Sequence, residues 1–415
     1  MEGKRIVSVD LGTSKVISVF GIPENGSIKI EGYSPKIDSR GIESGVIQNI
    51  EKVSNSLREA VEQAFRLKGD VPKKRTKIIL TINGSYIESE IVKGFVPVKD
   101  PDGEIDESDR IRVINTAVQR SNTSEKSIIY VHPNEYTIDD QKGIKEPVGM
   151  MGTKLEVETF ILKAKKNILD TLRKVAWKSN FEIENFVFSP IASSYAVLEE
   201  EEINQGVFLM DIGMGTVDIA VWNKGSLIYA DSFPIGGKYI INDLIKILRI
   251  TSKKAKELLE LFSNVYEEKD NNMEIEVEGI GERPSKKIKI SFVKETIFAR
   301  IEEIFERVKW YVEKVIEIEK LPAGIVLVGG IAKLKGITEV AENFFNVPCI
   351  VGKPKNFRGL STDIITDPSY TAALGALKIG YILRTSGYSS LSRKIKKGFS
   401  ISQIFRNIKY FFENF

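Results

Sequence analysis

The sequence is poor in the residues that build disulfide frameworks and metal centres. It holds one cysteine, Cys349, and one histidine, His132, in 415 residues. A single cysteine excludes a disulfide within the chain and any zinc site made of several cysteines, and it fits a reducing compartment. We expect Cys349 to be a small buried apolar residue. We expect His132 to be structural, because the sequence implies no serine, cysteine or acidic partner for catalysis.

Long apolar runs and a strong net charge are also missing. No run of 18 apolar residues occurs, so no membrane-spanning helix is expected, and the first ten residues lack the apolar core of a signal peptide. The net charge is +3, but residues 393–415 hold six basic residues and one acidic residue and so carry +5. The remaining body carries −2, which argues against a dedicated nucleic-acid binder. The basic end favours an acidic membrane surface as its partner, and we expect a cytoplasmic protein.

Two segments of the chain share one pattern of strand, turn and strand. DLGTSKV at 10–16 aligns with DIGMGTV at 211–217, and each aspartate ends an apolar strand before a glycine-containing turn. Two copies in the same context predict a duplicated fold. Glycine lets the backbone come close to a ligand, and the N–H groups of such a turn can point at an anion. The pair therefore predicts a clamp for a polyphosphate, and the alternative is two ordinary β-hairpins.

The side chains of these turns suit phosphate and a cation. Hydroxyl groups add donors and Lys15 adds positive charge, whereas Asp10 and Asp211 would repel phosphates unless a cation lay between them. We therefore expect Mg²⁺, held by these two aspartates through water. The candidate residues of the two turns are Asp10, Gly12, Thr13, Ser14, Lys15, Asp211, Gly213, Met214, Gly215 and Thr216.

Paired glycines follow strands at two further places. GGK comprises Gly236, Gly237 and Lys238, and VGG ends in Gly329 and Gly330. A backbone without side chains could approach a flat base or a ribose there. The alternative is a pair of strand–helix turns that need positive φ.

The order of these motifs resembles that of the actin/Hsp70/sugar-kinase superfamily. The matching segments are MDIGMGTVDIAVW, PIGGKYIIND, IVLVGGIAKL and YTAALGALKIG. More narrowly, the chain resembles the FtsA family of bacterial cell-division proteins in GVIQNI (45–50), INGSYIES (82–89), DQKGIKEPVGMMGTKLEVE (140–158) and 192–222. The resemblance implies an α/β, actin-like (ribonuclease H-like) duplicated fold, with two halves around a nucleotide cleft. It implies ATP with Mg²⁺ at the residues named above, and an inserted α+β subdomain called 1C.

The resemblance also implies a division of the chain into subdomains. The expected ranges are 1–83 and 163–195 for 1A, 84–162 for 1C, 196–232 and 311–384 for 2A, and 233–310 for 2B. Apolar periodicity predicts a helix near 49–68, and we also expect helical stretches near 106–120, 166–179, 240–263, 293–319 and 370–383. A Ser-rich linker is expected at 385–398 and an amphipathic membrane-targeting helix at 399–415, although such a helix could instead dock on the protein body. Its apolar stripe includes Phe405, Ile408, Phe411, Phe412 and Phe415.

The function implied by the resemblance is that of a scaffold rather than an enzyme. The family polymerises, here through 1C, binds the C-terminal peptide of the tubulin-like protein FtsZ through 2B, and tethers it to the cytoplasmic face of the inner membrane at the division site. Other divisome proteins are expected partners and nucleic acid is not. Within 2B we favour Lys294 and Arg300 as contacts of the FtsZ peptide, and the alternative is an ordinary solvated charged face.

Some residues depart from the superfamily pattern. Met214 stands where the second turn usually has glycine, and Ile331 stands where the third motif often has Gly or Ala. Lys256 and Glu257 are weak candidates near adenosine, because the usual AE-x-x-K pattern is not kept. Ser189 offers no Glu or Gln to orient water, so we expect at most slow hydrolysis and name no catalytic residue. Competing functions are a sugar-kinase-like enzyme, for which we identify no base, and an actin-like pilus-assembly protein.

Overall fold

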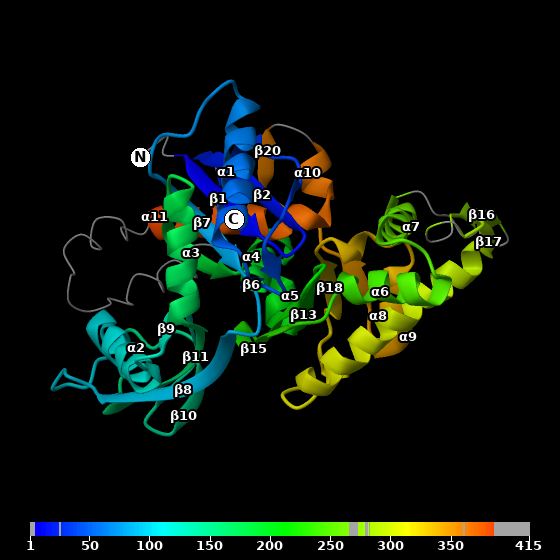
Figure 1. The fold of residues 1–415 in the computed structure, drawn as a ribbon. Coiled ribbons are helices and arrows are strands. Elements are labelled where there is room, and N and C mark those ends of the chain that lie inside the picture. Colours follow the sequence, from blue (N-terminus) through cyan, green and yellow to red (C-terminus); the bar gives the residue numbers. More distant parts are fainter. Residues whose placement is uncertain are drawn as a thin grey trace.

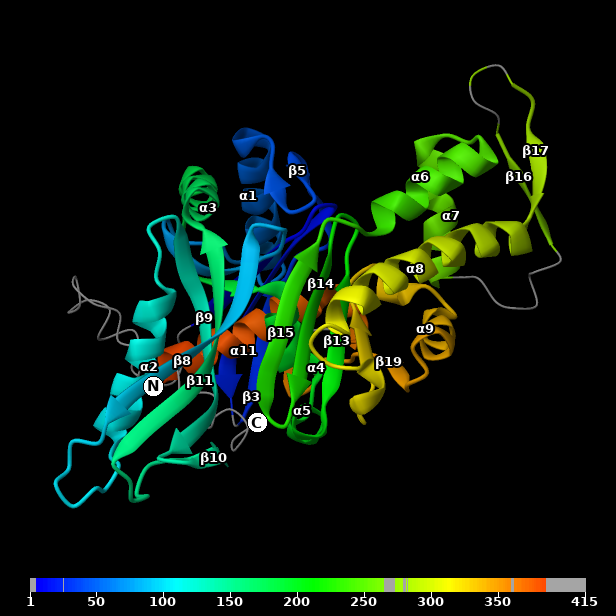
Figure 2. The same ribbon diagram turned by 90° about the horizontal axis from the view of Figure 1, so that it is seen from below.

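The computed structural model describes residues 5–24, 26–264, 273–278, 281, 283–359 and 362–385 (Figures 1 and 2). The predicted membrane helix and, except for residue 385, the predicted linker lie outside the described residues. In the part of the chain that is described, no helix is both long enough and apolar enough to cross a bilayer.

The first sheet is built around β1 (Ile6–Leu11). Its strand order is β12-β7-β1-β2-β3-β20, and β4 (Ile37–Asp38) pairs with β2. The other strands are β2 (Lys15–Glu24), β3 (Ser27–Tyr33), β7 (Thr76–Ile82), β12 (Phe181–Phe188) and β20 (Phe357–Gly359). β1 runs antiparallel to β2 and parallel to β7, so a hairpin and a crossover meet at the central strand.

The second sheet repeats this arrangement with the order β15-β14-β13-β18-β19. Its strands are β13 (Val207–Ile212), β14 (Val217–Asn223), β15 (Ser226–Phe233), β18 (Ile325–Val328) and β19 (Cys349–Val351). β13 is antiparallel to β14 and parallel to β18. Asp10 lies opposite Ile17, and Asp211 lies opposite Asp218. The predicted duplication is therefore confirmed strand by strand.

Two helices join the halves. α11 (Thr371–Thr385) contacts β1 and α4 (Ser189–Val197), and α4 contacts β13 and β14. A Cβ atom on Gly375 would lie only 1.7 Å from the carbonyl oxygen of Ala192, so α11 and α4 can cross this closely only with glycine there. The expected subdomain 2A, at 196–232 and 311–384, includes β20 and α11. In the structure, β20 pairs with β3 and α11 contacts β1, so both elements lie against the first sheet.

Helices on the outer side of the first sheet bury a continuous apolar face. α1 (Ile50–Arg66) contacts β2 and β3, and α3 (Lys166–Lys178) contacts β12. Asn49 caps α1 by accepting a bond from the Lys52 N–H at 3.0 Å. A short hairpin of β5 (Ile42–Glu43) and β6 (Val46–Ile47) precedes α1.

The inserted segment forms a separate sheet of order β10-β9-β11-β8, with α2 (Glu107–Ser121) against it. Its strands are β8 (Ile87–Pro97), β9 (Lys126–Ile138), β10 (Gln141–Ile144) and β11 (Lys154–Lys165). β9 and β8 pack against β15 of the second half (Figure 2). His132 is buried there with its ring 5.5 Å from that of Trp222, and burial lowers the pKa of His132 to about 4. A neutral, packed imidazole agrees with the structural role expected for it.

The second half carries a helical lobe (Figure 1). The lobe comprises α6 (Gly237–Leu248), α7 (Ser252–Asn264), β16 (Glu274–Val277), β17 (Lys286–Lys289) and α8 (Ile290–Val312). Outside the lobe, α5 (Glu200–Gln205) contacts β14, α9 (Ile337–Phe345) contacts α8 and β19, and α10 (Thr362–Thr366) precedes α11. The prediction of one helix to residue 319 is wrong, because α8 ends at Val312. The chain then turns and buries Ile318 and Leu321 in the core. Cys349 is buried as expected, and burial raises the pKa of its thiol to about 12.

Candidate functional site

The two repeated turns face each other. The Gly12 N–H donates to the Lys15 carbonyl at 3.0 Å, and the Gly213 N–H donates to the Thr216 carbonyl at 2.9 Å. A Cβ atom on Gly215 would lie 2.4 Å from Oγ1 of Thr13. The turns therefore touch, and any side chain at position 215 would push them apart.

A small cavity of about 40 Å³ lies between the turns. Its lining includes all ten turn residues predicted from the sequence, together with Gly329 and Gly330. The structure adds lining residues that the phosphate motifs did not identify: Asn83, Ser189, Asp218, Pro368, Ser369, Thr371 and Ala372. The last four lie in or next to the YTAALGALKIG segment, a superfamily motif for which the sequence predicts no ligand contact.

Three charged groups meet at this cavity: Asp10 is buried, and Lys15 and Asp211 are half-buried. Burial raises the pKa of Asp10, whose Oδ1 accepts a bond from Thr81 Oγ1 at 2.6 Å. Burial, followed by the charge of Asp10, raises the pKa of Asp211 to about 7. Burial also lowers the pKa of Lys15 to about 8, and its Nζ donates to the Ser369 carbonyl at 2.9 Å. The charge of Asp10 destabilises the ionised form of Asp211, and a cation between the two carboxylates would offset this.

Asp218 is the main buried group that the sequence motifs missed. Its Oδ2 accepts a bond from Thr216 Oγ1 at 2.8 Å, and Ser232 Oγ donates to its other oxygen. The Ser232 hydroxyl in turn accepts the Gly84 N–H at 2.8 Å, at the start of the inserted segment. This hydrogen-bonded series links the second turn to the inserted sheet. The sequence feature that could have identified Asp218 is its position as the one charged residue in the mostly apolar strand TVDIAVW.

The GGK segment is fastened to the second turn by its backbone. The Gly237 N–H donates to Gly213 at 3.0 Å, and the Lys238 N–H donates to Met214 at 2.8 Å. A Cβ on Gly236 would lie 2.7 Å from the Gly213 oxygen, so close approach rather than positive φ explains this glycine. The Lys238 side chain forms an ion pair with Glu43 of the first half.

The VGG segment lies against the carboxylate of Asp211. Gly329 has φ of +88°, and a Cβ there would lie 2.3 Å from Asp211 Oδ1. The positive φ agrees with the alternative of a strand–helix turn, and the glycine also leaves room for the Asp211 carboxylate; an approach to a base or ribose stays a prediction. Within the described ranges, no group of three or more His, Cys, Asp or Glu side chains could hold a metal directly. The donor set fits a cation held by Asp10 and Asp211 through water.

The residues predicted to bind the FtsZ peptide lie on α8, away from this cavity. Arg300 Nε lies 2.5 Å from Asp243 Oδ2 of α6, and Nη1 lies 2.5 Å from Glu303 Oε2. Its charge is thus already balanced by two carboxylates. Lys294 is half-buried six residues earlier on the same helix.

The remaining candidates do not join the cavity lining. Lys256 and Glu257 are exposed on α7, and Glu257 pairs with Lys254 at 3.2 Å. The proposed membrane residues Phe405, Ile408, Phe411, Phe412 and Phe415 lie outside the described residues.

Comparisons with known proteins identify relatives of this chain. A family model described as "Cell division protein FtsA" matches residues 208–375, and one described as "SHS2 domain inserted in FTSA" matches 84–163. FtsA of Pseudomonas aeruginosa is 31% identical over 93% of this chain and 92% of the relative. FtsA of Neisseria meningitidis is 35% identical over 90% of each.

Solved structures with the same fold extend the comparison. MreB5 of Spiroplasma citri bound to ADP has a TM-score of 0.56 at 14% identity, covering 95% of this chain and 99% of the other. A chain of the PilM-PilN type IV pilus biogenesis complex has a TM-score of 0.63 at 12% identity, covering 90% and 97%. These likenesses confirm the actin-like fold with its inserted domain.

Proposed function

The chain belongs to the FtsA family of cell division proteins, and on that premise we propose that it is an actin-like, ATP-binding scaffold. In this proposal it polymerises at the cytoplasmic membrane, binds the FtsZ C-terminal peptide and holds it there. The observation that supports nucleotide binding is the pair of facing turns with the buried Asp10 and the half-buried Asp211 at the cavity between them. The similarly folded MreB5 is described as bound to ADP and to AMPPNP.

Each half would contribute the same kinds of group to ATP. The turn N–H groups and the hydroxyls of Thr13, Ser14 and Thr216 would bind phosphate oxygens, and Lys15 would offset their charge. Asp10 and Asp211 would hold Mg²⁺ through water. The cavity of about 40 Å³ between the turns is much smaller than a nucleotide, and in this proposal the halves move apart when ATP binds. The exposed Lys238–Glu43 pair is one contact across the cleft that this opening would break.

Calorimetry with Mg-ATP tests the nucleotide site. Asp211→Ala removes one of the two cation-side carboxylates and should clearly weaken Mg-dependent binding. Asp170→Ala on the exposed face of α3 is the matched control, since Asp170 lies far from the turns in the sequence and forms an exposed ion pair with its neighbour Arg173. Equal affinities of the wild type and Asp211→Ala would contradict the site.

Membrane attachment is proposed for the amphipathic segment at 399–415. Flotation with anionic vesicles should fail when residues 393–415 are deleted and should weaken with Phe412→Glu, which places a charge in the apolar stripe. Tyr410→Glu adds the same charge in place of an aromatic residue on the opposite side of the predicted helix, and should have a smaller effect. Undiminished flotation of the deletion protein would mean that the anchor lies elsewhere.

FtsZ binding is proposed for the surface of α6 and α8. Besides Arg300, this surface exposes Tyr239 and Phe292, which are 42% and 46% accessible and suit an acidic peptide with apolar residues. Arg300→Glu would repel both the peptide and Asp243, and should raise the dissociation constant of a fluorescent FtsZ peptide. Arg307→Glu, exposed on the same helix, is the control. Equal dissociation constants for the two variants would favour the solvated-face alternative.

A further inference from the structure

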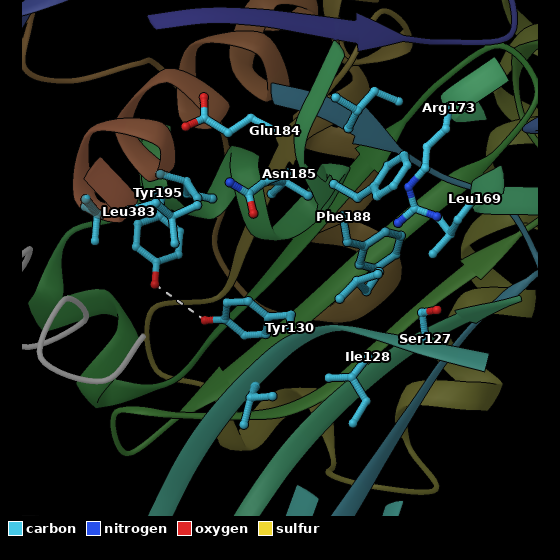
Figure 3. Close-up of a pocket in the computed structure, with 17 residues that line it drawn as sticks. Ser127, Ile128, Tyr130, Leu169, Arg173, Glu184, Asn185, Phe188, Tyr195 and Leu383 are labelled. Atoms are coloured by element: carbon cyan, nitrogen blue, oxygen red, sulfur yellow. Dashed lines mark hydrogen bonds between the residues drawn. The ribbon is translucent and has the colours of Figure 1, made fainter. Parts of the chain in front are cut away.

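A second and larger cavity, of about 350 Å³, lies where the inserted sheet meets the first half. Figure 3 shows its walls, which come from β9, α3, β12, α4 and the last two turns of α11. This volume is within the range of about 300–1,000 Å³ that is typical of ligand pockets. We call this cavity the β9–α11 groove.

The walls of the groove suit aromatic and aliphatic side chains. Phe186, Phe188, Tyr130 and Tyr195 line it, and the two tyrosine hydroxyls lie 3.4 Å apart. The charged groups at its edges already have partners. Arg384 on α11 donates to Glu184 at 2.5 Å, and Arg173 lies over the ring of Phe186 and bonds to Asp170. An apolar occupant would therefore leave none of these charges without a partner.

We propose that the groove holds the C-terminal apolar stripe of this same chain, around Phe411, Phe412 and Phe415, whenever that stripe is not on a membrane. The inference rests on the membrane role proposed above for these residues, because one set of side chains serves both contacts. What points to this occupant is where the described chain ends. Ile382 and Leu383, in the last turn of α11, form part of the groove wall, and α11 ends at Thr385.

The remaining chain is long enough to return. Nineteen residues lie between Thr385 and Phe405, and in extended form this segment would span up to about 65 Å. A tether of this length holds its far end at an effective concentration near the millimolar range, so even weak apolar contacts would be populated. The membrane and the groove would bury the same side chains and exclude each other. Attachment to the membrane would then open the groove.

Disulfide trapping tests the contact without any membrane. In a Cys349→Ser background, Ser127→Cys at the groove and Asn414→Cys in the tail leave every apolar side chain of the stripe in place. The full-length pair should form an intramolecular disulfide about tenfold faster than a control pair of Lys142→Cys and Asn414→Cys. Lys142 lies on β10, which pairs with the opposite end of β9. Equal rates, or disulfides between two molecules only, would overturn the proposal.

Vesicles of phosphatidylcholine and phosphatidylglycerol supply the second measurement. They should slow the Ser127–Asn414 disulfide, and Ile128→Glu in the groove should raise the vesicle-bound fraction severalfold at limiting lipid. Val71→Glu, at a position that is 75% exposed between α1 and β7, is the matched control and should leave that fraction unchanged. If Ile128→Glu has no more effect than Val71→Glu, the groove does not compete for the tail. A disulfide without any flotation would retain the groove contact and refute the membrane role, so the two failures are distinguishable.

Discussion

Replacing Asp211 with asparagine should have opposite effects on stability and on ligand binding. In the protein without Mg²⁺, the folded state must bury the Asp211 carboxylate beside Asp10, and these two causes raise the pKa of Asp211 from 3.8 to about 7. Asparagine has a similar shape and no charge, so the variant avoids this cost. The same change removes one of the two carboxylates that would hold the cation.

The size and pH dependence of the stability effect follow from the pKa. Below pH 3.8 the carboxyl is protonated in both the folded and unfolded states, and it contributes no difference. As the pH rises toward 7, the unfolded chain ionises first and the folded state loses stability relative to it. At about 1.36 kcal/mol per pKa unit, the cost reaches at most about 4 kcal/mol above pH 7. The advantage of Asp211→Asn should therefore grow between pH 4 and pH 7 and then level off.

Urea denaturation in EDTA, followed by circular dichroism at several pH values, measures this advantage. Asp170→Asn, at an exposed carboxylate of α3, is the control and should show little change. Adding Mg-ATP should stabilise the wild type by mass action and stabilise Asp211→Asn much less. An advantage that is the same at pH 5 and pH 8 would refute the argument from the buried charge. Equal stabilisation by Mg-ATP would refute the assignment of the cation site.

Three further predictions concern other parts of the molecule. Gly375→Val should lower the free energy of unfolding by several kcal/mol, because the added Cβ would lie 1.7 Å from the Ala192 oxygen where α11 crosses α4. An unchanged urea midpoint would show that the two helices can move apart at little cost. Burial lowers the pKa of Lys378 from 10.5 to about 8. Below pH 8 the buried ammonium therefore lowers the free energy of unfolding, and this cost disappears as the pH rises from 8 to 10.5, where the folded state already holds the neutral amine. The stability advantage of Lys378→Met should accordingly be largest near pH 7 and shrink toward pH 10, and a constant difference in urea melts would count against this. Phe95→Glu, on the 56% exposed Phe95 of β8, should reduce filaments seen by electron microscopy without changing Mg-ATP affinity, and normal filaments would argue against self-contact through this face.

The sequence predicted the parts of the site that depend on local spacing. A strand, an aspartate and a glycine turn lie within about ten consecutive residues in each half, so both turns were visible before the structure. Their mutual approach was inferred only because the pattern occurs twice. Thr81 and Asn83 could not be assigned in this way. Thr81 meets Asp10, and Asn83 meets the cavity, only because β7 pairs with β1, and no short segment records that pairing.

The duplicated fold, the two phosphate-type turns and the apolar stripe of the tail were thus determined by the sequence alone, through periodicity and repetition. Only the tertiary structure decided that α11 packs with the first half, that Arg300 is already paired with Asp243, and that Ser232 links Asp218 to Gly84. The β9–α11 groove likewise exists only in three dimensions, since its walls come from segments between Ser127 and Leu383. The physical reason is that periodicity reports which side of an element is buried, whereas packing across distant elements depends on the shape of every intervening side chain.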